Sequence, residues 1–202
     1  MIENPLKTKL KNYNIILASG SPRRKQFFEA LGLDFEIRLK PVEENYPQGF
    51  KAEEISNYLA ILKASPFEAD LKKTDLLVTS DTVVWCKGES LAKASNPEEA
   101  ITMLTKLSGA WHQVISSVCF TTSSFQKVLF DSTDVKFKKL SLSEIEFYIQ
   151  EFKPYDKAGA YGIQEWLGAI GIEEIKGSYN NVVGLPTHLV YKMLMDIAIG
   201  KN

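Results

Sequence analysis

The sequence contains little of what a disulfide framework, a zinc site or a membrane anchor would need. Only two of its 202 residues are cysteines and two are histidines. Cys86 and Cys119 lie far apart in apolar surroundings, which favours reduced, buried thiols over a disulfide. His112 and His188 stand alone in the sequence, so we expect packed or surface histidines and no zinc ligands.

Long apolar runs are also missing. No segment approaches the roughly 20 consecutive apolar residues that a membrane span requires. Residues 1–13 contain three lysines but no apolar stretch of signal-peptide length. We therefore expect a cytoplasmic protein without membrane contact.

Neither sign of charge dominates, because 24 lysines and arginines face 25 aspartates and glutamates, for a formal net charge of -1. No global positive field attracts nucleic acid, and no platform of mixed aromatic and basic residues stands out. An anionic ligand would need a local basic cluster. The sequence also lacks the glycine-rich phosphate loop, the dinucleotide fingerprint, the Gly-x-Ser-x-Gly elbow and paired Cys-x-x-Cys motifs. These absences disfavour the familiar kinases, dehydrogenases, hydrolases and zinc modules.

What is present is an alternation of strand and helix patterns with no repeat and no Gly/Ser linker, which predicts one domain over residues 1–202. Strand patterns cover residues 14–19, 35–39, 76–85, 113–122, 127–137 and 168–175. Helical patterns cover residues 22–33, 53–64, 97–109, 141–152 and 186–199. Because hairpin-like strand pairs lie among the helices, we expect a mixed α/β fold with an antiparallel or mixed sheet.

The first candidate site is a basic helix start. Ser21 is placed to cap the helix and Pro22 fits its first turn, while Ser19 precedes them and Arg23 and Arg24 follow. Free backbone amides at a helix N-terminus bind anions, whereas cations there cost about 0.3 to 1 kcal/mol each. Two arginines at this position therefore favour a phosphate-binding site over a capped helix with a solvated basic turn.

Three further features become informative in combination. Asp81 interrupts an apolar strand, where an unpaired carboxylate is costly to bury, so it should meet a partner or emerge at a strand end. Residues 154–164 form a polar loop whose glycines allow close approach of a ligand. Taken singly, these features fit a turn-capping aspartate and an ordinary loop, and Lys63 and Lys93 fit solvated surface lysines.

Ordered motifs extend along nearly the whole chain. They are LASGSPRR at residues 17–24, Glu43, Lys63 with Ala64, SDTVV at 80–84, Lys93, LSG at 107–109 with His112, DKAGAYGIQ at 156–164 and VVGLP at 182–186. In this combination and order the chain resembles the Maf family of nucleotide pyrophosphatases.

The resemblance implies hydrolysis of a nucleoside triphosphate between its α- and β-phosphates, a divalent cation such as Mg²⁺ or Mn²⁺, and a homodimer. It implies an elongated, twisted mixed sheet flanked by helices, with two lobes around a central cleft. By similarity Asp81 is the proton acceptor, and Arg24, Lys63 and Lys93 hold the triphosphate. Glu43 assists the metal or the attacking water, so Asp81 and Glu43 are the expected metal ligands.

The resemblance also indicates the base. Arg23, Thr82 and Gln164 match the positions that mark the dTTP- and UTP-preferring subfamily. The other substrate contacts that we expect are Ser19, Ser21 and Lys157. The expected activity is therefore release of pyrophosphate from dTTP and UTP, and modified pyrimidine nucleotides would fit the same site. A house-cleaning role and a link to arrest of cell division are part of this expectation.

Other readings remain open at this point. One Maf subgroup prefers 7-methyl-GTP, and a similarly folded family hydrolyses inosine and xanthosine triphosphates. The Gln164 amide, which offers a donor and an acceptor together, favours a pyrimidine but could also meet a purine. A non-catalytic, nucleotide-binding regulator of division would need Arg24 and the glycine loop but not Asp81 beside Lys63 and Lys93.

Overall fold

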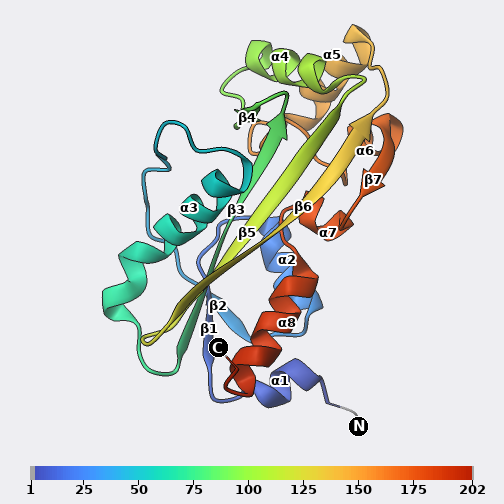
Figure 1. Cartoon of the computed structure of the whole chain (residues 1–202). Helices are drawn as coiled ribbons and strands as arrows, with labels where there is room; N and C mark the ends of the chain where they lie inside the picture. The colour runs from blue at the N-terminus through green and yellow to red at the C-terminus, as the bar shows by residue number, and fades with distance from the viewer. Residues whose placement is uncertain (1–2, 202) are drawn as a thin grey trace.

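The computed structural model describes residues 3–201, which form a seven-stranded mixed sheet with helices on both faces (Figure 1). The strands are β1 (Asn14–Leu17), β2 (Phe35–Ile37), β3 (Asp75–Cys86), β4 (Glu89–Leu91), β5 (Trp111–Thr121), β6 (Gln126–Phe137) and β7 (Ile172–Lys176). Their order is β2-β1-β3-β5-β6-β7, and β4 pairs with the end of β3. Strand β1 runs parallel to β2 and β3, and the other pairs are antiparallel, which confirms the predicted mixed sheet.

The structure contains eight α-helices and one 3₁₀ helix within residues 3–201. They are α1 (Pro5–Lys9), α2 (Pro22–Ala30), α3 (Ala52–Ala64), η1 (Ser65–Asp70, a 3₁₀ helix), α4 (Pro97–Leu107), α5 (Leu142–Phe152), α6 (Trp166–Gly171), α7 (Tyr179–Val183) and α8 (Thr187–Ala198). Ser21, Asn96 and Ser141 cap α2, α4 and α5 with their side chains. Within residues 3–201, no helix combines the length and the apolar composition that a membrane crossing requires.

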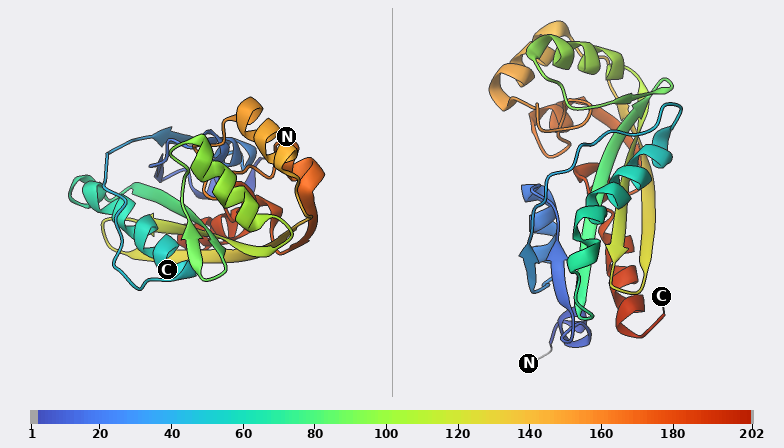
Figure 2. Two further views of the ribbon diagram at one scale, coloured as in Figure 1. Left: turned by 90° about the horizontal axis from the view of Figure 1, so that it is seen from above. Right: turned by 90° about the vertical axis from the view of Figure 1, so that its left-hand side faces the viewer.

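At the end of the sheet that contains β1 and β2, successive side chains alternate between two apolar layers. Leu17 and Val78 face α2 and α8, whereas Ile16 and Leu77 face α3 and η1. The two views of Figure 2 and that of Figure 1 show α3 on one side of the long strands and α2 and α8 on the other. This alternation explains why residues 14–17 and 75–78 are apolar at every position except the first of each strand.

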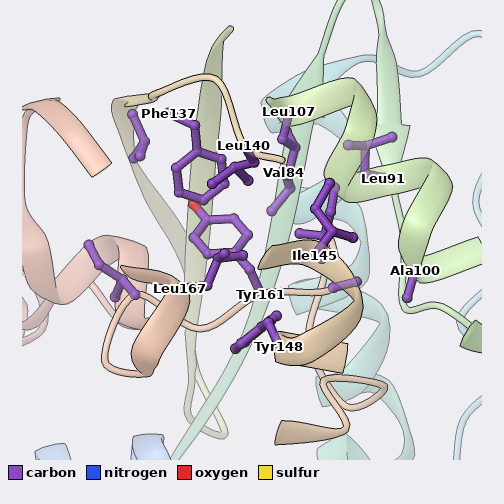
Figure 3. Packing of buried hydrophobic residues seen from close by; sticks show 14 of the residues in the cluster. Val84, Leu91, Ala100, Leu107, Phe137, Leu140, Ile145, Tyr148, Tyr161 and Leu167 are labelled. Atoms are coloured by element: carbon purple, nitrogen blue, oxygen red, sulfur yellow. The ribbon is translucent and has the colours of Figure 1, made fainter. Parts of the chain in front are cut away.

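Strands β3, β5 and β6 are 12, 11 and 12 residues long and extend to the other end of the sheet. If the two layers around β1 are taken as the first apolar cluster, the side chains buried at this other end form a second apolar cluster. There α4, α5 and α6 cover the sheet, and Val84, Phe137, Tyr148 and Tyr161 are buried together (Figure 3). The same three strands therefore run through both clusters and give the molecule its elongated form (Figure 1).

One predicted element is different in the structure. Residues 168–175 were expected to form a strand, but α6 occupies residues 166–171 and only β7, from residue 172, is extended. Isoleucines among small residues favour a strand pattern locally. The helix forms because its glycines allow close packing: a Cβ at Gly168 would lie 2.0 Å from the carbonyl oxygen of Ile163, and one at Gly171 would lie 3.3 Å from Leu140. Tertiary contact overrides the local preference.

We predict that Gly168→Ala destabilises the fold by about 2 to 3 kcal/mol, because the added methyl group must displace backbone atoms. Urea unfolding would measure the change. Gly20→Ala is the matched control, since its Cβ would meet only Leu39, at 3.9 Å. Equal stability of the two variants would show that α6 is not pressed against Ile163.

Candidate active site

The site begins at a gap in the sheet beside β3. Strand β1 accompanies β3 as far as Val78, and β4 joins it only from Val84. Within the described part of the chain, residues 79–83 therefore pair only with β5. Ser80, Asp81 and Thr82 lie in this gap. An unpaired strand edge leaves backbone groups that need other partners, and side chains from both faces can reach the opening.

The partly buried guanidinium group of Arg24 occupies the gap. Its Nη1 donates to the Ser80 carbonyl oxygen at 2.9 Å and to Ser19 Oγ at 3.4 Å. Its Nε donates to the Gly184 carbonyl oxygen at 3.0 Å, and its Nη2 donates to Thr82 Oγ1 at 3.1 Å. Burial lowers the pKa of Arg24 from its ordinary value, yet an arginine remains charged in proteins. Arg24 thus joins the β1–α2 turn, β3 and the α7–α8 turn.

Lys63, in the last turn of α3, brings two carboxylates together at the same gap. Its Nζ lies 2.7 Å from Asp81 Oδ1 and 3.1 Å from Glu44 Oε1. Its side chain is only 16% exposed, and that of Asp81 only 9%. Charge-assisted hydrogen bonds at low exposure are strong and directional. Asp81 is therefore oriented by Lys63, with Glu44 beside it.

Glu44 occupies the place that the sequence analysis gave to Glu43. Glu43 is exposed, its carboxylate accepts a hydrogen bond from Asn45 Nδ2 at 3.4 Å, and it does not line the cleft. Glu44 does line the cleft. Of the two glutamates, only Glu44 lies within 4 Å of Lys63 Nζ. In the structure it is therefore Glu44, the residue after the expected Glu43, that lies beside Lys63.

The gap opens into a cleft made of two adjoining pockets of about 150 and 440 Å³. Ten of the eleven predicted site residues line these pockets: Ser19, Ser21, Arg23, Arg24, Lys63, Asp81, Thr82, Lys93, Lys157 and Gln164. The lining residues that the sequence analysis did not single out include Glu44, Asp156, Tyr161, Glu165 and Gly184. The sequence could have indicated three of these residues, because they lie in or beside the polar loop. Gly184 could not be predicted in this way, because it contributes only its backbone carbonyl group.

The cations of the cleft differ in how far protein carboxylates neutralise them. The Lys157 side chain is 10% exposed, and its Nζ lies 2.7 Å from Asp156 Oδ1 and 2.9 Å from Glu165 Oε1. Lys93 is exposed, is held in place by a backbone bridge to Ala158, and has no carboxylate within 4 Å among residues 3–201. Lys93 is the more available of the two lysines for an anion.

Arg23 links α2 to the polar loop across the cleft. Its Nη1 lies 3.0 Å from Asp156 Oδ2. Burial alone would raise the pKa of Asp156, but hydrogen bonds from Lys157 and Arg23 outweigh it and hold this pKa below its usual range. Asp156 is therefore ionised at neutral pH and connects two cations of the cleft.

The donor set near the gap fits a divalent cation that is shared with phosphate. No group of three or more His, Cys, Asp or Glu side chains suited to a metal occurs in the described residues. Asp81 and Glu44 nevertheless supply two carboxylates, both within 3.1 Å of Lys63 Nζ. Mg²⁺ is usually held by one or two carboxylates, with substrate phosphates and water completing its shell. A cation at this place would thus depend on a bound nucleotide.

Fold and cleft together define an α/β protein whose cleft combines exposed cations and a helix N-terminus, which suit a phosphorylated ligand, with an oriented carboxylate, which suits proton transfer. The chain belongs to the Maf-like protein family, whose family model matches residues 14–197.

Curated relatives cover almost the whole chain. It is 57% identical over 192 residues to the dTTP/UTP pyrophosphatase of Flavobacterium johnsoniae, covering 95% of this chain and 99% of that protein. It is 54% identical over 191 residues to the dTTP/UTP pyrophosphatase of Flavobacterium psychrophilum, covering 95% and 98%. Among solved structures, the Staphylococcus aureus Ham1 protein is similar with a TM-score of 0.45 at 19% identity, over 61% of this chain and 71% of that one.

Beneath the cleft, His112 of β5 supports the polar loop. It is buried, and its Nε2 lies 2.7 Å from the hydroxyl oxygen of Tyr161, which lines the cleft. Its Nδ1 has no hydrogen-bond partner among the described residues. Burial lowers the pKa of His112 to about 4. His112 is therefore neutral in the folded protein, in agreement with the expectation of a packed histidine.

This shift predicts a loss of stability in mild acid. The pKa of His112 is lower in the folded than in the unfolded chain, so the unfolded chain binds more protons between pH 6.5 and 4. The contribution of neutral His112 to the free energy of unfolding is complete above pH 6.5 and is lost as the pH falls. At pH 5 the free energy of unfolding should be lower by about 2 kcal/mol. Urea unfolding at pH 7, 6 and 5 should show this loss in the wild type and in His188→Gln, because His188 is exposed, but less of it in His112→Gln. Identical pH profiles for all three would contradict the assignment.

Proposed function

We propose that the protein is a nucleoside triphosphate pyrophosphatase that converts dTTP and UTP to the nucleoside monophosphate and pyrophosphate. The observation that carries this proposal is the Asp81 carboxylate, oriented by Lys63 in the same cleft as exposed cations and the Gln164 amide. Relatives that are named dTTP/UTP pyrophosphatases and are more than half identical to this chain support it. Modified pyrimidine nucleotides would be bound by the same groups.

The triphosphate would be bound by the N-terminus of α2 and by cations at the rim. Ser21 caps this helix, and residues 22–24 of its first turn line the cleft, where the positive end of the helix dipole favours an anion. Lys93 adds an exposed ammonium group. Arg23 can exchange its ion pair with Asp156 for a phosphate oxygen at little cost, because its side chain is 26% exposed and the pair is screened by solvent.

Asp81 would accept the proton of the attacking water. Lys63 Nζ donates to Asp81 Oδ1 at 2.7 Å, and this charge-assisted hydrogen bond orients the carboxylate. Oδ2 accepts no hydrogen bond from the described residues and remains for water. A divalent cation held by Asp81 and Glu44 would lower the pKa of that water and shield the phosphate charge.

The base would be recognised by Gln164. Its side chain is exposed in the cleft and makes no hydrogen bond to another residue between 3 and 201. An amide offers one donor and one acceptor side by side, as the imide edge of uracil or thymine requires. Thr82 has a supporting role in this proposal, because its hydroxyl group is shared between Arg24 and Ser116.

Other parts of the proposal follow from the family resemblance. They are Mg²⁺ or Mn²⁺ as the cation, a homodimer, action as one domain and a cytoplasmic location. The continuous sheet through both apolar clusters supports a single domain. Sedimentation would test the dimer.

The proposal predicts selective release of pyrophosphate from dTTP and UTP over CTP, inosine triphosphate and 7-methyl-GTP, in the presence of Mg²⁺ or Mn²⁺. Asp81→Asn should lower kcat by about 100- to 10,000-fold, the usual contribution of a general base. Faster turnover of purine nucleotides would move the specificity to the rival subgroup. Tight nucleotide binding without turnover under either metal would favour a non-catalytic regulator.

The adjacent glutamates provide a matched pair of variants. Glu44→Gln should lower kcat by about tenfold or more, because it removes a charged oxygen ligand beside Asp81. Glu43→Gln should keep activity near that of the wild type, since this side chain lies outside the cleft. Pyrophosphate release under a titration of Mg²⁺ would separate the two. A larger effect at Glu43 than at Glu44 would overturn the assignment.

A further inference from the structure

A buried tyrosine of α5 supports the turn that carries Gln164. The Tyr148 side chain is fully buried in the second apolar cluster, where Figure 3 shows it among the residues that cover the sheet. Its hydroxyl oxygen accepts a hydrogen bond from the Gly162 backbone N–H at 3.0 Å and donates its proton to Glu165 Oε2. One hydroxyl group therefore binds the chain on both sides of Gln164.

Glu165 completes this support. Its second oxygen, Oε1, lies 2.9 Å from Lys157 Nζ, and its backbone N–H donates to the Gly162 carbonyl oxygen at 3.1 Å. The ion pair lies directly over Gly162: a Cβ there would be 2.9 Å from Glu165 Cδ and 3.1 Å from Lys157 Cε. A side chain at residue 162 would therefore have to displace the Glu165 carboxylate and the end of the Lys157 side chain.

On its other side the turn is held by α6. Gly168 brings this helix so close to Ile163 that an added Cβ would lie 2.5 Å from the Ile163 carbonyl carbon. The Tyr148 ring is itself stacked on Phe152, with ring centres 5.2 Å apart and an interplanar angle of 24°. The backbone of residues 162–165 is therefore held from two directions, while the amide of Gln164 stays exposed and unbonded to the described residues.

We propose that Tyr148 and Glu165 are positioning residues for nucleobase recognition, which hold the Gln164 amide at one place in the cleft. This inference rests on the proposed function, because it takes Gln164 to read the base. Recognition of a base by hydrogen bonds requires the side chain that binds it to be held within about 0.5 Å of its productive position. Loosening this turn should therefore weaken discrimination between bases more than it weakens binding of the triphosphate.

The test compares Tyr148→Phe with Tyr155→Phe. The second change removes the same atom from a tyrosine in the polar loop that follows α5, but the Tyr155 side chain does not line the cleft and its hydroxyl makes no hydrogen bond within residues 3–201. The substrates are UTP, dTTP and CTP, because CTP keeps the pyrimidine ring and the triphosphate but presents a different hydrogen-bonding edge. In Tyr148→Phe, kcat/KM for UTP and dTTP should fall about tenfold, mainly through KM.

For CTP the change in kcat/KM should stay within about twofold, so the preference for UTP over CTP falls about fivefold or more. Tyr155→Phe should leave the preference unchanged. Glu165→Ala should reproduce the loss, and Glu165→Gln should restore part of it, because its amide oxygen can still accept from Tyr148. If Tyr148→Phe does not fold, Glu165→Ala tests the same inference. The thermal unfolding midpoint of each variant shows whether it is folded.

An equal fall for all three nucleotides would make Tyr148 and Glu165 structural residues only and would overturn the inference. An unchanged preference in both variants would do the same. Loss of the proposed function is distinguishable, because the wild type itself would then show no preference for dTTP and UTP.

Discussion

The structure depends on a place where the sheet has no strand. Between residues 79 and 83 one edge of β3 is open, and the Arg24 guanidinium takes the position that a neighbouring strand would fill. A buried charge is costly unless its hydrogen bonds are satisfied, so its acceptors on the β1–α2 turn, on β3 and at Gly184 must all be in place. The helix start that would bind phosphate and the strand that carries Asp81 are therefore located by one side chain.

The other cations of the cleft fall into two groups: those that stay paired with protein carboxylates and those that can pair with a ligand instead. Lys63 and Lys157 are mostly covered, and each contacts two carboxylates. Removing a partner from such a pair leaves an uncompensated charge at low exposure. Arg23 and Lys93 are more accessible, so their charges can be transferred to a ligand with less loss. A phosphorylated ligand can thus be bound without dismantling the groups that orient Asp81.

The sequence predicts those features that are local. The caps at Ser21, Asn96 and Ser141 each depend on residues three positions apart, and they were predictable for that reason. Ten of the eleven site residues that the motifs predicted line the cleft. The choice between Glu43 and Glu44 depends on the direction of a segment without regular structure, and α6 depends on its contact with Ile163. The acceptors of Arg24 on Ser80 and Gly184 lie 56 and 160 positions away, beyond any local pattern.

The two ends of the cleft are connected by the sheet and not by a linker. Asp81 pairs with Ser117 on β5, and three residues further along the same strands Val84 pairs with Val114, which lines the cleft together with Gln164. The separation of the carboxylate from the loop is therefore set by two hydrogen-bonded strands. At the loop end, the loop is supported by α5, α6 and His112 and is ion-paired to Arg23, and none of these groups hydrogen-bonds to Lys63 or Asp81 within residues 3–201. Such an arrangement allows the loop end to vary in the base it accepts while the geometry around Asp81 is preserved, because the residues that hold each end are separate.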